Sequence, residues 1–210
     1  MTLKQQWGAV GIVIAVIAAT VATGMHLMRN QLFPVTVGST APAFSAPELG
    51  THKLRTLADY RGKVVLLNLW ATDCAPCRVE MPSIEQLQRA YGDKGLHVVA
   101  ISEDDFAKED SIAGFVRHLG LTFEVLHDSA QAVGQAYQIT GYPETFVIGP
   151  EGTIRKKWIG AADWSSQGNR ALIAQLLGLA TPRATSDTGD AAQVIPLIPD
   201  TTAGPGPGEP

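Results

Sequence analysis

The chain contains two cysteines, Cys74 and Cys77, separated by Ala75 and Pro76. Two thiols at this spacing can carry out two-electron thiol–disulfide exchange, in which one thiolate attacks a disulfide and the second thiol releases the product. The preceding residues 64–70 are apolar except for Asn68, which predicts a buried strand leading directly to the pair. The spacing and its context therefore predict a redox-active dithiol.

A helix beginning near Ala75 would position both sulfurs. Pro76 suits the first helical turn because it lacks an amide hydrogen and has a preset φ, so Cys74 is expected at the N-cap. Residues three apart share a helix face, within the roughly 5.5–6 Å Cα separation that a disulfide tolerates. The positive end of the helix favours an anion, which lowers the pKa of the first thiol from about 8.5. We expect Cys74 to be the nucleophile and the more buried Cys77 to be the resolving thiol.

Structural roles for the pair are less well supported. Two cysteines cannot complete a tetrahedral zinc site, and the five histidines are scattered along the chain. A permanent disulfide across two residues closes too small a loop to gain much entropy. Redox chemistry is the preferred interpretation.

Length, composition and net charge limit the class of protein. The chain has 210 residues, 45% of them hydrophobic and 17% charged, with a formal net charge of −4. These values are typical of one globular domain with appendages. The mild acidity offers no basic patch for phosphate contacts, so nucleic acid is not an expected partner.

The first appendage is an apolar N-terminal segment. Residues 7–25 carry no charge, and as a helix they would extend roughly 28 Å, about the thickness of a bilayer's hydrocarbon core. A single N-terminal span normally leaves the terminus inside the cell, so the rest of the chain is expected outside the cytoplasm. A cleaved signal peptide is the alternative, since small residues near Ala22 offer a cleavage site. The retained anchor is preferred because the apolar stretch exceeds that of typical signal peptides.

The second appendage is the C-terminal segment, which is rich in Pro, Gly, Thr and Asp. Such a composition cannot bury enough apolar surface to order itself, so we expect a disordered tail. The predicted organisation is an anchor and linker at residues 1–34, a folded domain at 35–180 and the tail at 181–210.

The folded domain is predicted as an α/β unit. Expected strands at 64–70, 96–101 and 122–126 alternate with helices at 76–91, 108–119 and 131–137. A hairpin of strands 144–148 and 153–159 follows, and a last helix ends near residue 179. Val79 and Ile84 are expected on the buried stripe of the helix at 76–91. This order predicts a mixed central sheet with helices on both faces.

The dithiol segment resembles a known family. Residues 68–82, which include Trp70, Pro76 and both cysteines, resemble the pattern N-F-W-A-T-W-C-x-P-C-R-x-E-M-P of membrane-anchored, thioredoxin-like proteins of the TlpA/ResA/CcmG type. Residues 37–44 are similar to the N-terminal segment of that family's domain, and residues 141–148 to its G-x-P-x-T-F-x-I segment. The likeness covers the whole folded domain.

The resemblance implies a thioredoxin-like fold and an extracytoplasmic thiol–disulfide oxidoreductase on the bacterial cytoplasmic membrane. It implies exported cysteine-containing proteins as substrates, including those of cytochrome c maturation. A membrane thiol donor would keep the pair reduced, since an oxidising compartment alone would leave it closed. It also implies that Pro143 is cis and faces the dithiol, where the backbone of Tyr142 would pair with an extended substrate.

Two carboxylates are further candidates. Glu80 lies three residues after Cys77, on the same helical face, where it could exchange protons with the buried thiol. A solvated surface position is the alternative for Glu80. Glu144 follows the expected cis-proline and could line the cleft, although a charge at a strand edge is an ordinary alternative. Asn68 stands where thioredoxins carry a buried acid, so one proton relay is absent.

Asp73 departs from the family pattern, which has tryptophan before the first cysteine. A carboxylate about 6 Å from the sulfur would raise the thiol pKa by roughly half to two units, depending on the local dielectric. We therefore expect Cys74 to be less acidic than in typical relatives. The docking surface should also be less apolar.

Two other function classes remain open. A peroxiredoxin-type peroxidase would share the fold but needs Pro-x-x-x-Thr-x-x-Cys, which is absent around Cys74. A copper-binding module could use Cys74, Cys77 and a distant histidine such as His127, because thiolates suit Cu(I). No resident cofactor or metal is expected besides the redox-active disulfide itself.

Overall fold

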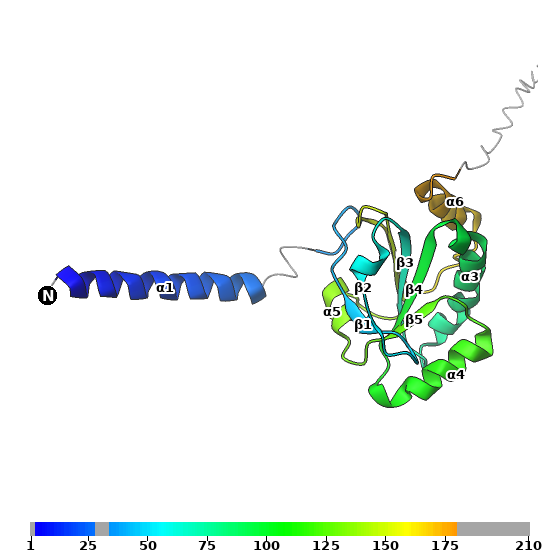
Figure 1. The fold of residues 1–210 in the computed structure, drawn as a ribbon, viewed down its shortest axis with the longest axis horizontal. Coiled ribbons are helices and arrows are strands. Elements are labelled where there is room, and N and C mark those ends of the chain that lie inside the picture. The colour runs from blue at the N-terminus through cyan, green and yellow to red at the C-terminus, as the bar shows by residue number, and fades with distance from the viewer. Residues whose placement is uncertain (1–2, 28–33, 180–210) are drawn as a thin grey trace, which may run out of the picture.

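Strand β3, Val64–Trp70, lies at the centre of the main sheet, and every residue in it is buried. The computed structural model describes residues 3–27 and 34–179 (Figure 1). The main sheet has five strands in the order β5-β4-β3-β6-β7. The other strands are β4 (Leu96–Ser102), β5 (Glu124–His127), β6 (Glu144–Ile148) and β7 (Ile154–Ile159).

The sheet is mixed, as predicted. Strands β3, β4 and β5 run parallel, whereas β6 and β7 are antiparallel to their neighbours. Parallel neighbours require crossover connections, which here are helices α3 (Ala75–Tyr91) and α4 (Glu109–Leu119). Two successive right-handed crossovers in one direction place both helices on the same face of the sheet.

Two core clusters cover the two faces. The first joins alternate β3 residues such as Leu66 to helices α3, α4 and α6 (Gln167–Leu176), and it contains Cys77. The second joins the remaining β3 residues, such as Leu67, to helix α5 (Ala132–Tyr137) and to the segment at 35–46. The alternation of strand side chains separates the two clusters. Helices therefore lie on both faces, as predicted.

The predicted helices and strands of the domain are present within a few residues. A small antiparallel sheet of β1 (Ser45–Pro47) and β2 (Leu54–Thr56) was not predicted from the sequence. Each of these strands has only three residues. Short 3-10 helices lie at Leu57–Tyr60, Gly92–Lys94 and Phe106–Lys108.

The prediction that Val79 belongs to the buried stripe of α3 was wrong. Its side chain is 76% exposed, whereas Cys77, Met81 and Ile84 are fully buried. Val79 and Ile84 are five residues apart, about 140° around a helix, so they cannot share a narrow stripe.

Helix α1, Leu3–Leu27, covers the residues of the predicted membrane anchor. Among the described residues, no helix combines the length and hydropathy needed to cross a membrane. The anchor over residues 7–25 is therefore not shown and stays a prediction. The predicted tail at residues 181–210 lies outside the described residues.

Candidate active site

The dithiol lies at the start of helix α3, as predicted. Cys74 is the N-cap residue, with an extended backbone, and its sulfur accepts a hydrogen bond from the amide of Cys77 at 3.2 Å. Cys74 and Cys77 form a disulfide with a Cα–Cα distance of 5.3 Å. The same amide would stabilise a thiolate on Cys74 in the reduced enzyme, because unpaired amides at a helix start favour an anion.

The two sulfurs differ in exposure. Cys77 is fully buried in the first core cluster, whereas Cys74 is only half-buried. Ala75, Pro76 and Arg78 beside them are exposed, so the rim of the site is open to an approaching protein. An external sulfur can therefore reach Cys74 and not Cys77, which fits the predicted roles of nucleophile and resolving thiol.

The predicted cis-proline lies at the same end of the sheet. The Tyr142–Pro143 peptide bond is cis, as the family resemblance implied. The β3–β6 register pairs Leu69 with Glu144, which places Pro143 beside Trp70 where β3 ends. After Trp70 the chain enters the loop that carries Cys74, so the proline and the dithiol lie at the same end of the sheet.

Trp70 itself is a core residue. Its side chain is fully buried, with its ring centroid 5.0 Å from that of Phe115 on α4. Its backbone oxygen accepts a hydrogen bond from the amide of Glu103 at 2.9 Å. Trp70 therefore supports the dithiol loop from within and offers no surface to a substrate.

Glu80 is buried beneath the site, so the solvated alternative does not hold. Its carboxylate accepts hydrogen bonds from Asn68 Nδ2 at 2.7 Å, the amide of Ala162 at 3.2 Å and the indole of Trp164 at 3.3 Å. Asn68 also donates to the Thr145 hydroxyl at 2.8 Å. Burial raises the pKa of the Glu80 carboxyl, although these three donors oppose the shift.

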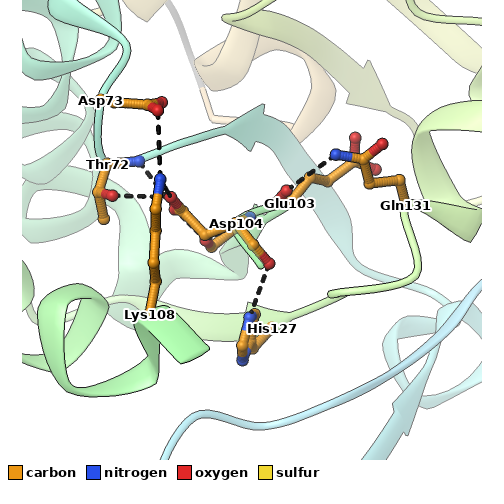
Figure 2. A network of polar contacts seen from close by, with 8 residues as sticks. Thr72, Asp73, Glu103, Asp104, Lys108, His127 and Gln131 are labelled. Atoms are coloured by element: carbon orange, nitrogen blue, oxygen red, sulfur yellow. Dashed lines mark hydrogen bonds and ion pairs between the residues drawn. The ribbon is translucent and has the colours of Figure 1, made fainter. Parts of the chain in front are cut away.

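Asp73 has a partner that the sequence did not reveal. Its carboxylate is 75% exposed and lies 3.2 Å from Nζ of Lys108 (Figure 2). Lys108 also lies 3.4 Å from Asp104, which accepts hydrogen bonds from the Thr72 amide and hydroxyl at 2.8 and 2.7 Å. A neighbouring cation therefore opposes the expected repulsion between Asp73 and the Cys74 thiolate.

Asp104 fixes the loop that precedes Cys74. Burial alone would raise its pKa, but hydrogen bonds from Thr72, Ser102 and Lys108 outweigh that effect and lower the pKa overall. The carboxylate is therefore held ionised beneath the loop. Thr72 links it to the residues next to the nucleophile.

The expectation that Glu144 lines the cleft needs correction. Glu144 is fully buried, and strand alternation places it on the same face as Phe146, in the layer opposite helix α3. Its carboxylate lies 3.0 Å from Nζ of Lys157, an ion pair across β6 and β7, and accepts a hydrogen bond from the amide of Thr140 at 3.1 Å. It anchors the loop before the cis-proline and does not face the dithiol.

Sequence reasoning also missed Glu103, which follows directly after β4. Its carboxylate accepts hydrogen bonds from the Tyr142 hydroxyl at 2.7 Å and from the amide of Gly134 at 2.5 Å. The available signal was a pair of acids at residues 103–104, where a predicted buried strand ends beside the dithiol strand. Carboxyl ends of parallel strands meet at one edge of a sheet.

Comparison with known proteins decides the family. The model described as the AhpC/TSA family matches residues 37–157, more than half of the chain. The chain belongs to the AhpC/TSA family.

Curated relatives of this AhpC/TSA chain include proteins named as thiol-disulfide oxidoreductases and as thioredoxin-like proteins. The thiol-disulfide oxidoreductase ResA of Geobacillus kaustophilus is 35% identical over 145 residues, covering 69% of this chain and 80% of the relative. The thioredoxin-like protein YneN of Bacillus subtilis is 40% identical over 124 residues, covering 59% and 71%.

A solved structure agrees with this assignment. The crystal structure of a thiol:disulfide interchange protein of the thioredoxin family from Chlorobium tepidum has a TM-score of 0.58 and 25% identity, covering 68% of this chain and 99% of that one. With the relatives above, it shows that this AhpC/TSA member is a thiol-disulfide oxidoreductase with a thioredoxin-like fold.

The copper alternative gains no support from the site. Within residues 3–27 and 34–179, no group of three or more His, Cys, Asp or Glu side chains is placed to hold a metal ion. His127 is buried, with Nε2 3.0 Å from the backbone oxygen of Asp104 (Figure 2).

Proposed function

We propose that this enzyme reduces disulfides in exported proteins, among them substrates of cytochrome c maturation. The observation that carries the proposal is the exposure difference between Cys74 and Cys77 at the start of helix α3, beside a cis-proline. A dithiol built in this way can form a mixed disulfide through its outer sulfur and resolve it through its inner one.

The reaction starts from the reduced enzyme. The Cys74 thiolate attacks one sulfur of the substrate disulfide, and the other sulfur leaves as a thiolate that takes a proton from solvent. Cys77 then loses its proton and attacks Cys74, which breaks the mixed disulfide and releases the second substrate sulfur as a thiolate that also takes a proton from solvent. The substrate gains two electrons and two protons, and the enzyme becomes the disulfide seen in the structure.

Glu80 is the proposed acceptor for the proton of Cys77. It lies one helical turn after Cys77, is buried with it, and has a raised pKa, so it can hold a proton near neutral pH more readily than a solvated carboxylate. Asn68 and Trp164 orient the carboxylate.

The proposed setting is the outer face of the bacterial cytoplasmic membrane. The charge-free segment at residues 7–25 supports an anchor, and a membrane thiol donor would return the disulfide to the dithiol after each turnover. Fractionation of cells that express the full chain tests this. We expect the protein in the membrane fraction, cleaved by protease added to spheroplasts, whereas a variant lacking residues 1–34 should leave the membrane.

Trapping tests the proposed chemistry. A Cys77→Ala variant should hold its substrates as mixed disulfides on Cys74, because the resolving thiol is missing. The adducts should appear on non-reducing gels of whole cells and disappear with reductant. Exported cysteine-containing proteins are the expected partners.

The matched control is Cys74→Ala. It keeps one thiol, but that thiol is buried, so it should capture few or no partners. Equal trapping by both variants, or trapping of cytoplasmic proteins only, would contradict the proposal.

A further inference from the structure

A groove of about 520 Å³ adjoins the cis-proline on the helix α5 side of the sheet. Tyr142, which precedes Pro143, forms one wall, and Glu103 lies at the end of β4 beside Trp70. Glutamines 131, 135 and 138 line the groove from in and around α5, and no lysine, arginine or histidine is among its lining residues. The groove is therefore polar and carries a negative charge whenever Glu103 is ionised.

Glu103 is a buried acid at the wall of this groove. Its side chain is buried, with only 3% of the residue exposed, and within the described part of the chain no cation forms an ion pair with it. Three other buried acids do have one, since Glu85 pairs with Arg89, Asp104 with Lys108 and Glu144 with Lys157, whereas Glu80 and Asp128 form no ion pair within the described residues. The absence of a cation matters because burying a carboxylate costs free energy unless a cation or several hydrogen-bond donors compensate its charge.

Backbone geometry keeps room for this carboxylate. A Cβ added at Gly134 would collide with both carboxylate oxygens of Glu103, so a larger residue there would force the Glu103 side chain to move. Gln131 Nε2 also donates to the backbone oxygen of Glu103 at 3.2 Å (Figure 2). The acid is thus held on both its main chain and its side chain at the wall of the groove.

Two hydrogen-bond acceptor positions of the Glu103 carboxylate are filled and two remain. A carboxylate offers about four lone-pair sites, and the Tyr142 hydroxyl and Gly134 amide each take one. Burial, and to a smaller extent the nearby Asp128, raise the pKa of Glu103. A cation entering the groove would supply the missing compensation, because opposite charge favours the ionised form.

The position of Tyr142 indicates which part of a substrate would enter the groove. If an extended substrate pairs with the backbone of Tyr142 while its cysteine reaches Cys74, residues flanking that cysteine pass the mouth of the groove. Lysine and arginine have side chains long enough to carry a charge from the strand into a recess.

We propose that Glu103 is a specificity-determining residue, which makes the enzyme favour disulfides with a lysine or arginine near the attacked cysteine. This inference rests on the proposed reductase function and names the substrate class of that same site.

Three disulfide-bonded peptides test it, identical except for Lys, Gln or Glu beside the attacked cysteine. We expect kcat/KM of the reduced enzyme to be about tenfold or more higher for the Lys peptide than for the Gln peptide, the size of one hydrogen bond to a charged group, and lowest for the Glu peptide. In Glu103→Gln the Lys and Gln peptides should become equal within about threefold.

A control and a second variant keep the test decisive. Glu124 accepts a hydrogen bond from Tyr60 at 2.8 Å, the same kind of contact away from the groove, so Glu124→Gln should keep the Lys preference. Gln135 is exposed at the groove, and Gln135→Lys should abolish the preference by placing a cation in the groove that Glu103 lines without disturbing the core.

Equal kcat/KM for the three peptides in the wild-type enzyme would overturn the inference and leave the reductase function intact. An unchanged Lys preference in both groove variants would also overturn it. Failure of the reduced enzyme to act on any of the peptides would instead count against the proposed function.

Discussion

The carboxylate of Asp73 and the ammonium group of Lys108 lie 3.2 Å apart, directly beside the nucleophilic Cys74. The acid comes from the loop before the cysteine, and the lysine, 35 residues further along the chain, ends the 3-10 helix Phe106–Lys108. Sequence alone shows only the acid, which by itself would make a thiolate less stable. Because Lys108 also pairs with the buried Asp104, this one cation faces two carboxylates and only partly offsets the charge of Asp73.

The first prediction concerns the thiol pKa of the reduced enzyme. Lys108→Met should raise the pKa of Cys74 by a few tenths of a unit up to about one unit, because Asp73 then acts on the thiolate without a counter-charge. Ultraviolet thiolate absorbance as a function of pH measures this value. High salt should reduce the difference, since the groups are exposed.

Asp73→Asn is the matched control for that pair. It removes the negative charge and leaves the lysine, so the pKa of Cys74 should fall. Asp73→Asn with Lys108→Met should return close to the wild-type value. A pKa that is unaffected by Lys108→Met would show that the ion pair does not act on the dithiol.

A second prediction follows from the buried acids Glu80 and Glu103. Burial raises both pKa values above the unfolded value, so the folded state binds these protons more tightly than the unfolded state does. The free energy of unfolding should therefore fall as the pH rises from about 4.5 through the folded pKa values, with a slope of at most roughly 1.4 kcal/mol per pH unit for each acid.

Chemical denaturation of the oxidised protein across this pH range measures the slope. Glu80→Gln should make it shallower because one of the two titrating groups is gone. Asp104 acts in the opposite sense: its pKa is lowered, so its stabilisation is present at neutral pH and is lost as the pH falls through the folded pKa. A slope that Glu80→Gln leaves unchanged would contradict the assignment to Glu80.

Much of the fold was predictable because its signals are local. The uninterrupted apolar run at residues 64–70, the proline after Cys74 and the Gly-Pro-Glu-Gly turn at 149–152 each depend on near neighbours in sequence. The two short strands β1 and β2 were not predictable from pattern, since three residues give too little periodicity. The error at Val79 came from treating a spacing of five as one helical face.

The residues of the site likewise fall into those found from local sequence motifs and those found only in the structure. The dithiol and the cis-proline lie in sequence motifs, whereas Lys108 and Glu103 reach the site only because β4 lies beside β3 in the sheet. Glu144 was misplaced for a related reason: proximity to Pro143 in sequence says nothing about the face of the strand. Residues brought in by strand order needed the structure.

The third prediction concerns the loop that carries Cys74. Asp104→Asn should destabilise the oxidised protein by about 1–3 kcal/mol, because the buried Thr72 contacts lose a charged acceptor. Thr72→Val, which keeps the backbone contact and removes the hydroxyl one, should cost less. Denaturant unfolding measures both values, and a larger loss in Thr72→Val would contradict the central role of Asp104.

The last prediction compares two fully buried tryptophans, Trp70 and Trp164. The indole nitrogen of Trp70 has no hydrogen-bond partner among the described residues, whereas that of Trp164 donates to Glu80 at 3.3 Å. Replacement of either by phenylalanine removes a similar volume, but only Trp164→Phe also takes a donor from a buried carboxylate. It should therefore be about 1–3 kcal/mol more destabilising at neutral pH than Trp70→Phe.

The pH dependence separates the hydrogen bond from packing. In Trp164→Phe the Glu80 carboxylate loses a donor that favours its charged form, so the pKa of Glu80 should rise further. The excess cost of Trp164→Phe over Trp70→Phe should then shrink at low pH, where Glu80 is protonated in both variants. Denaturant unfolding of the two variants at neutral and acidic pH checks this, and a pH-independent difference would assign it to cavity volume alone.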